Sequence, residues 1–476
     1  TTNGYSTGAN IGGFVGTMFS GVTIEDSYAT GAVTSAGSQV GGFAGYAGHN
    51  STGVPSYIKR SYATGAVSAA GKNYVGGFIG YGEYYLRVED SYATGVVNGA
   101  SYVGGFIGET DHSDYFIRSY AKGTVNGTSR VGGFAGRAYS SNTSNSCESG
   151  AGVCGNNYSA DSAPYIPSFS YVSASGNVTG TGGSYVGGLI GSVDEATNHL
   201  SYLIKVNESF ATGNVQGASI VGGLVGYANG IRVEESYASG TVASNANDNS
   251  IGGLIGYVET TSGSTYNFIF DSYATGNVSG NSRIGGFIGE AYTQTCQQCI
   301  QINRSYSKGA VTGTNETTSN GFVGSIRYHS SYGYSIYSVA NSSNPSFYIN
   351  AGNNNNGTTS DAGSLDNVDY TGGYPKTLAQ LQAQGTFTGN WDFQNVWAID
   401  PIVNGGTPHL RRNTAEEVTG LTAVAFNNTI LLRWRGKDME NGYVVVAAQG
   451  ATAPTAADCS TNSAIDVGAN TFYYHN

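Results

Sequence analysis

Paired carboxylates come closest to a catalytic arrangement in this 476-residue sequence. They stand directly before a Ser-Tyr step in three places, Glu25-Asp26, Glu89-Asp90 and Glu234-Glu235. Two carboxylates about 5–9 Å apart can act as the acid and the nucleophile or base of a glycoside hydrolase. Because the pairs occupy the same place in a repeated segment, we interpret them as turn-capping or solvated side chains and expect no catalytic residues.

Metal ligands are sparse in the sequence. The six histidines are dispersed and no H-E-x-x-H pattern occurs, which argues against a zinc hydrolase. Oxygen ligands cluster in the segments D-N-V-D and N-A-N-D-N, although neither completes a calcium-binding loop. Asp366, Asp369 and Asp248 are therefore weak calcium candidates, and we expect no other cofactor.

The five cysteines lie outside the repeated motifs. Cys147 and Cys154 share the longest segment between motifs, and Cys296 and Cys299 form a C-Q-Q-C step. A redox C-x-x-C usually accompanies a βαβ pattern and a zinc site needs further ligands nearby, and both are absent. We interpret the two pairs as loop-closing disulfides, which implies an oxidising compartment and leaves Cys459 over.

Two short motifs recur along most of the chain, and they must position any functional residue. The first, V-G-G-F-I-G and its variants, stands at Ile11–Gly16, Val40–Gly45, Val75–Gly80, Val103–Gly108, Val131–Gly136, Val186–Gly191, Val221–Gly226, Ile251–Gly256 and Ile284–Gly289, with a degenerate copy at Asn320–Gly324. The second, S-Y-A-T-G-x-V, begins at Ser27, Ser61, Ser91, Ser119, Ser209, Ser236, Ser272 and Ser305, with looser copies near Ser170 and Ser335. No helix or lysine follows the glycines as in a phosphate-binding loop.

A period of roughly 28–36 residues indicates a repeat array. Small and large residues alternate in S-Y-A-T-G-A-V, as in strands with one buried face. We predict an all-β fold, a β-solenoid (β-helix) of about ten coils over residues 1–340. Its aligned tyrosines are expected to form an aromatic file at Tyr28, Tyr62, Tyr92, Tyr120, Tyr237, Tyr273 and Tyr306.

The residues after 340 predict two further parts. Residues 341–412 are expected to cap the solenoid with one short helix over 376–384, N-capped by Thr377, and with Trp391 and Trp397 covering the open end. Residues 418–476 alternate as the strands of a small β-sandwich.

The combined unit, G-G-[FL]-x-G followed by S-Y-A-T-G-x-V, resembles the GLUG repeat of large bacterial surface proteins over about residues 5–340. The resemblance implies a secreted, surface-exposed β-solenoid and implies neither a ligand nor catalytic residues. The W-D-F…V-W-A-I-D…G-G-T-P-H-L-R segment looks like the tail that closes such arrays. Residues 418–476 resemble the first half of a fibronectin type III module, which leads us to expect that the natural chain continues past Asn476.

Composition narrows the classes of partner. Charged residues make up 11% of the chain against about 25% in typical domains, and the net charge is −11. The basic residues are scattered, so we expect no nucleic-acid partner. No window is long and apolar enough to span a membrane.

We therefore predict a non-catalytic extracellular protein of the cell surface, an adhesin-like rigid rod. The segments between G-G-F-x-G and the next S-Y vary most in length and are expected to contact partners: other copies of the chain, neighbouring surface proteins, or host or surface glycans. One alternative is a structural subunit that polymerises into an extracellular filament or sheath by strand complementation. A second alternative is a polysaccharide-cleaving β-helix enzyme.

Overall fold

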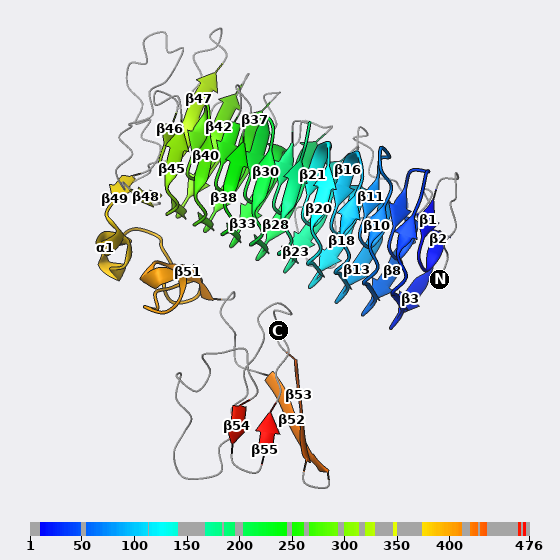
Figure 1. Ribbon diagram of the computed structural model, residues 1–476. Coiled ribbons are helices and arrows are strands. Elements are labelled where there is room, and N and C mark those ends of the chain that lie inside the picture. Colours follow the sequence, from blue (N-terminus) through cyan, green and yellow to red (C-terminus); the bar gives the residue numbers. More distant parts are fainter. Residues whose placement is uncertain are drawn as a thin grey trace. The chain divides into compact units, whose positions relative to one another are not determined.

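The structure is a computed structural model that describes residues 10–48, 54–112, 114–140, 167–182, 185–195, 203–244, 250–260, 266–293, 299–313, 319–328, 346–349, 374–411, 419–426, 429–435, 465–467 and 470–472. The chain folds as two compact units, Thr1–Pro408 and His409–Asn476. The first unit is a β-solenoid in which successive coils add short strands to five parallel sheets (Figure 1). We number these sheets I to V in the order in which the chain passes through them.

The strands of the first three sheets come from V-G-G-F-I-G and from the segment before S-Y. Sheet I contains β1 (Ile11–Gly12), β6 (Val40–Gly41), β11 (Val75–Gly76), β16 (Ser101–Gly104), β21 (Ser129–Gly132), β26 (Val186–Gly187), β31 (Ile220–Gly222), β36 (Ser250–Gly252), β41 (Ile284–Gly285) and β46 (Ser319–Asn320). Sheet II contains β2 (Val15–Met18), β7 (Ala44–Gly48), β12 (Ile79–Glu83), β17 (Ile107–Asp111), β22 (Ala135–Ser140), β27 (Ile190–Glu195), β32 (Val225–Asn229), β37 (Ile255–Thr260), β42 (Ile288–Thr293) and β47 (Val323–Tyr328). Sheet III contains β3 (Thr23–Glu25), β8 (Ser56–Lys59), β13 (Leu86–Glu89), β18 (Tyr115–Ile117), β23 (Ser168–Ser170), β28 (Ile204–Asn207), β33 (Ile231–Glu234), β38 (Asn267–Phe270) and β43 (Ile300–Asn303).

The strands of the last two sheets come mainly from S-Y-A-T-G-x-V. Sheet IV contains β4 (Tyr28–Ala29), β9 (Tyr62–Ala63), β14 (Tyr92–Ala93), β19 (Tyr120–Ala121), β24 (Ser173–Ala174), β29 (Phe210–Ala211), β34 (Tyr237–Ala238), β39 (Tyr273–Ala274), β44 (Tyr306–Ser307), β48 (Phe347–Ile349) and β49 (Tyr374–Lys376). Sheet V contains β5 (Val33–Thr34), β10 (Val67–Ser68), β15 (Val97–Asn98), β20 (Val125–Gly127), β25 (Val178–Gly180), β30 (Val215–Gly217), β35 (Val242–Ser244), β40 (Val278–Gly280) and β45 (Val311–Gly313).

Identical motif positions pair between successive coils. In sheet I, Val75 pairs in parallel with Val40 of the preceding coil and Val103 of the next. The degenerate motif at 320–324 supplies the last strands of sheets I and II, β46 and β47. The predicted all-β solenoid is thereby confirmed.

Two hydrophobic columns run along the interior. In the larger column, Phe106 is fully buried, and its ring centroid lies 4.8 Å from that of Phe78 and 4.6 Å from that of Phe134. The smaller column consists mainly of valines and isoleucines from sheets I and V, among them Val67 and Val75. Each coil therefore buries its apolar side chains against the same side chains of its neighbours, as expected for a solenoid.

Small residues recur where the backbones approach closely. A Cβ atom at Gly105 would lie 2.0 Å from the carbonyl oxygen of Gly133 and 3.1 Å from the Cβ of Ala121. The second glycine of V-G-G thus faces the alanine of S-Y-A inside the coil. No larger side chain fits at this glycine, which explains why both motifs keep small residues there.

The serines of S-Y-A form a hydrogen-bonded ladder. The Ser91 hydroxyl donates to the Glu89 carbonyl oxygen at 2.8 Å and accepts the Ser61 backbone N–H of the preceding coil at 3.1 Å. These serines are fully buried, so each hydroxyl satisfies a main-chain group that water cannot reach.

The two looser copies depart from this ladder. In the copy near Ser170, Val172 occupies the serine position, one residue before Ser173 in sheet IV. The copy expected near Ser335 lies outside the described residues. The ladder is continued instead by Ser346, whose hydroxyl accepts the Ser305 backbone N–H at 3.2 Å.

The predicted tyrosine file lies on sheet IV. The ring of Tyr92 stacks on Tyr62 at 4.9 Å and on Tyr120 at 5.0 Å between centroids. Two coils interrupt the run of tyrosines, with Ser173 and Phe210 at the equivalent positions. Because neighbouring rings cover one another's faces, most of the file presents ring edges outward.

The capping segment packs on the end of this file. It contains α1 (Leu378–Leu381), the 3₁₀ helices η2 (Gln384–Thr386) and η3 (Asn404–Gly406), and β50 (Trp397–Ala398). Thr377 caps α1 with a capping box, as expected, although the helix is shorter than predicted because η2 follows it. The fully buried Trp397 lies 6.1 Å from both Tyr273 and Tyr306 between centroids.

The second unit contains antiparallel strands. It holds β51 (His409–Leu410), a hairpin of β52 (Thr419–Phe426) and β53 (Thr429–Arg435), and a pair formed by β54 (Ile465–Val467) and β55 (Asn470–Phe472). These pairs fit the predicted small sandwich. Across the described residues, no helix has the length and apolar character needed to cross a membrane.

Candidate functional site

The edge where the strands of sheet II end and those of sheet III begin carries the most variable segments. We call it the loop edge. The connection is a single residue, Gly230, between β32 and β33, but it comprises residues 141–167 between β22 and β23. Because the strands of each sheet stack in register, all these connections leave the rod along one edge.

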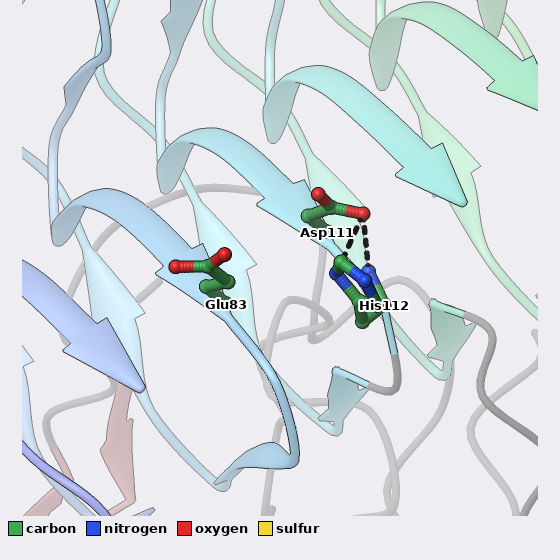
Figure 2. A group of neighbouring side chains, drawn as sticks. All are labelled: Glu83, Asp111 and His112. Atoms are coloured by element: carbon green, nitrogen blue, oxygen red, sulfur yellow. Dashed lines mark hydrogen bonds and ion pairs between the residues drawn. The ribbon is translucent and has the colours of Figure 1, made fainter. Parts of the chain in front are cut away.

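A three-residue group at the loop edge has the composition of a metal site. Glu83 ends β12, Asp111 ends β17, and the two are direct partners in the parallel register of sheet II. His112 follows Asp111, and potential ligand atoms of all three lie within 4.8 Å of one another. Figure 2 shows the Asp111 and His112 side chains in contact, with Glu83 on the neighbouring strand.

The geometry between Asp111 and His112 is tight. Nδ1 of His112 lies 3.0 Å from Oδ1 of Asp111, and the same oxygen accepts the His112 backbone N–H at 2.6 Å. The side chains of Asp111 and His112 are only 8% and 12% exposed. His112 has a φ of 57°, and its ring centroid lies 3.8 Å from that of Tyr84, the equivalent residue of the preceding coil. The imidazole is therefore held in place by both backbone and packing.

Neighbouring side chains surround the group. The Tyr46 hydroxyl donates to Oε2 of Glu83 at 2.7 Å. Asp114, fully buried, accepts the Thr110 hydroxyl at 2.7 Å and the Leu86 backbone N–H at 3.0 Å. Burial raises the pKa of the Asp114 carboxyl well above its usual range. Asp114 thus links the start of β18 to the preceding coil.

A second polar cluster lies two residues before the first on sheet II. Glu109 is 5% exposed, and its Oε2 lies 3.5 Å from Nη1 of Arg137, whose Nε lies 2.8 Å from Oδ2 of Asp194. Burial raises the pKa of Glu109 to about 7, and the nearby charges of Asp111 and Asp194 act in the same direction against the attraction of Arg137. A carboxyl that titrates near neutrality is a general-acid candidate, although ion-pair networks of structural origin perturb pKa values in the same way.

Glu290 holds the motif position of Glu109 in a later coil and forms more ion pairs than Glu109 does. Glu290 is buried like Glu109, but its Oε2 lies 2.9 Å from Nε of Arg283 and accepts the Ser250 hydroxyl at 2.6 Å, and its Oε1 pairs with Arg327. The Glu109 carboxylate has one arginine where Glu290 has two.

The paired acids of the sequence lie elsewhere, at the corner before sheet IV. The second acid of a pair adopts a left-handed backbone conformation, with a φ of 50° at both Asp26 and Asp90. Arginines of the next coils bind them, with Nε–Oδ1 distances of 2.7 Å for Arg60 and Asp26 and for Arg118 and Asp90. The Arg60 guanidinium lowers the pKa of Asp26, the opposite of what a general acid needs. This geometry agrees with a turn-forming role.

Most of the other predicted site residues are not described. The calcium candidates Asp248, Asp366 and Asp369 lie outside the described residues, as do Cys147, Cys154 and Cys296. Cys299 is fully buried and disulfide-bonded. The two proposed pairings remain predictions.

Sequence reasoning missed Glu83, Asp111 and His112, although a signal existed. Glu83 and Asp111 each stand three residues after the final glycine of a V-G-G-F-I-G motif, Gly80 and Gly108. In-register stacking of that motif places the two carboxylates side by side. His112 lies outside the repeated motifs, and in the sequence it is one of six dispersed histidines.

Comparison with known proteins agrees with the repeat. Residues 217–243, one coil from the end of β30 into β35, match the family model of the GLUG motif. A 170-residue stretch is 36% identical to halomucin of Haloquadratum walsbyi (strain DSM 16790 / HBSQ001), covering 33% of this chain and 2% of halomucin. The chain thus spans a small fraction of that relative, and no solved structure matches it. The first unit is a β-solenoid that carries the GLUG motif.

Proposed function

We propose that this chain is a non-catalytic, adhesin-like rod of an extracellular cell-surface protein. The observation that carries the proposal is the division of each coil into a stacked part and a variable part. The other four connections between sheets are at most six residues long, whereas the loop edge varies from one residue to 27. The rod supplies reach, and the loop edge supplies contacts.

Two further observations support the assignment. The GLUG motif and the stretch shared with halomucin are consistent with a surface-associated repeat protein. The antiparallel strand pairs of the second unit are consistent with a fibronectin type III-like module, a common building block of extracellular chains.

Surface display is tested by labelling the cells that make the protein. Antibodies raised against the purified chain should label intact cells, and brief protease treatment of those cells should remove the signal. Labelling that requires permeabilised cells would overturn the proposal. Contact through the loop edge is tested by replacing residues 141–166 with a short Gly-Ser linker. Binding of the purified chain to its cell or glycan targets should fall, whereas a control replacement of the partly exposed cap residues 399–402 should leave binding unchanged.

Assembly of copies into a filament by strand complementation is the second candidate function. Phe14, Phe19 and Tyr28 are 50%, 63% and 59% exposed, whereas Phe43, the equivalent of Phe14 one coil later, is fully buried. Another coil stacked on Phe14 and Tyr28, from the same chain or from another copy, would continue the phenylalanine column and the tyrosine file. Trp397 covers the tyrosine file at the other end, which opposes head-to-tail addition through sheet IV.

Sedimentation and electron microscopy separate the two functions. A filament subunit should associate with increasing concentration and show fibres with a constant axial repeat, and Phe14→Ser with Tyr28→Ser should weaken the association. Isolated rods at every concentration would rule out the filament.

A glycan-cleaving activity has little support from the site geometry. Arg60 and Arg118 bind the acids that would have to act as catalysts. Among the described residues, Glu109 is an acid whose pKa, about 7, suits a general acid, so Glu109→Gln is the informative variant. We expect no turnover on a glycan panel; cleavage that Glu109→Gln abolishes would contradict the non-catalytic assignment.

A further inference from the structure

We propose that Glu83, Asp111 and His112 form a binding site for a divalent transition-metal cation of zinc type. The site joins two successive coils at the loop edge, because Glu83 belongs to one coil and Asp111 and His112 to the next. It is separate from the predicted calcium ligands and goes beyond the proposed rod function.

Ligand geometry is the first argument. Nδ1 of His112 and Oδ1 of Asp111 lie 3.0 Å apart. Two ligands that bind one zinc ion tetrahedrally at about 2.0–2.1 Å lie about 3.3 Å from each other. The observed pair is therefore close to chelating distance, and the third ligand atom, from Glu83, lies within 4.8 Å of both. Small rotations of the Glu83 side chain, which is partly exposed, suffice to close the site.

Charge is the second argument. Glu83 and Asp111 are direct cross-strand partners, an arrangement that is unfavourable for two like charges. Within the described parts of the chain, neither carboxylate forms an ion pair with a lysine or arginine, and Asp111 contacts the imidazole of His112. Asp194, which holds the same motif position in a later coil, pairs with Arg137, and Glu109 and Glu290, two residues earlier in the motif, also have arginines. A bound dication would supply the charge that arginines supply at those positions.

Preorganisation is the third argument. The Tyr46 hydroxyl orients Glu83 at 2.7 Å, and the ring of Tyr84 packs on the imidazole of His112. Outer contacts of this kind hold metal ligands in their binding rotamers in known sites. Asp114 accepts hydrogen bonds from Thr110, at the end of the same strand as Asp111, and from Leu86 of the preceding coil, which helps to fix the two coils next to the group.

The ligand set selects the class of metal. An imidazole nitrogen with two carboxylates suits zinc, cobalt or nickel, whereas calcium requires six to eight oxygen ligands, more than this group offers. Water molecules would complete the coordination at the exposed side of Glu83. The bound cation would fasten the connection after β17 to the preceding coil and stiffen this part of the loop edge.

Titration of the full chain with zinc chloride and with calcium chloride tests the proposal. Isothermal calorimetry on chelator-treated protein should show one zinc site per chain that calcium does not fill at equal concentration. Cobalt(II) should bind with the visible absorption typical of nitrogen and oxygen ligands. Asp111→Asn and His112→Ala should each weaken zinc binding by about tenfold or more.

Glu259→Gln is the matched control. Glu259 occupies the same position in its motif as Glu83 and accepts the hydroxyl of a tyrosine in the preceding coil, Tyr227, at 2.9 Å. The Glu259→Gln substitution should leave the zinc affinity unchanged. Glu83→Gln, at a partly exposed position, should weaken zinc binding without unfolding the protein. Circular dichroism checks the fold of each variant. Absence of saturable zinc and cobalt binding, or binding that survives Asp111→Asn combined with Glu83→Gln, would overturn the proposal.

Discussion

Replacing Gly95 by alanine tests the close stacking of coils most directly. A Cβ atom at this position would lie 2.0 Å from the carbonyl oxygen of Gly65 in the preceding coil, whereas real Cβ contacts hardly ever fall below 3.0 Å. The two coils must therefore separate locally by about 1 Å. Hydrogen bonds flank the contact on both sides, from Thr94 N to Ala63 O at 3.0 Å and from Val67 N to the carbonyl of Val96 at 2.8 Å.

The expected cost follows from those two bonds. A separation of that size takes both beyond the range of a normal hydrogen bond, and each of the two N–H donors that loses its partner costs about 1–3 kcal/mol. Gly95→Ala should therefore lower the free energy of unfolding by about 2–6 kcal/mol. Gly31 is the matched control, since it holds the same motif position in the first described coil and a Cβ atom there would meet no atom of the described residues within 4 Å. Gly31→Ala should be neutral or stabilising by about 0.4–1 kcal/mol.

Two measurements give the result. Urea denaturation followed by circular dichroism compares the midpoints of the two variants with that of the parent chain. Hydrogen–deuterium exchange then localises the effect, because the amides of Thr94 and Val67 should exchange faster in Gly95→Ala and at the parental rate in Gly31→Ala. Equal midpoints for the two variants would refute the reasoning, because they would show that the stacked carbonyl can move aside without loss of pairing.

Three further substitutions probe other parts of the rod. Burial raises the pKa of Glu109 to about 7 in the folded chain, against 4.5 in the unfolded chain. The stability that the protonated carboxyl contributes is therefore fully present below pH 4.5, and about 3 kcal/mol of the free energy of unfolding is lost as the pH rises to 7. Glu109→Gln should remove this dependence, and parallel pH profiles of the denaturation midpoint in parent and variant would contradict it. Ser91→Ala leaves the buried Ser61 N–H unpaired and should cost about 1–3 kcal/mol in the same denaturation assay. Trp397→Ala should cost about 3–5 kcal/mol and speed amide exchange around Tyr306, whereas unchanged exchange would show that the cap does not protect this end.

The fold was predictable from the sequence because aligning the copies of the repeated motif gives the register in which the strands pair. Val75 and Val103 stand at the same place in two copies of one motif, so a parallel stack that aligns the motifs pairs them. The N-cap at Thr377 and the covering role of Trp397 were also readable, from capping chemistry and from the open end of an array. The copy near Ser170 was harder to align, because Val172 stands where the other copies have serine.

The candidate site was not predictable residue by residue. Glu83 and Asp111 are separated by a full repeat, and His112 belongs to no motif. Arg137 and Asp194 are 57 positions apart because a long connection intervenes, yet the register of sheet II brings them to 2.8 Å. Variation in loop length hides such pairs from any fixed spacing rule.

The sequence by itself determined the all-β solenoid, its number of coils, the small residues at close approaches and the aromatic columns, because each depends on a local motif repeated in register. Only the tertiary structure decided which charged side chains meet. Stacking brings residues that are one repeat apart in sequence to the distance of neighbouring strands, about 4.8 Å. Which interaction forms there depends on the side chain at the paired position of the adjacent coil. Glu290 meets two arginines and forms a closed ion-pair cluster, whereas Glu83 meets Asp111 and His112 and forms a group suited to a cation.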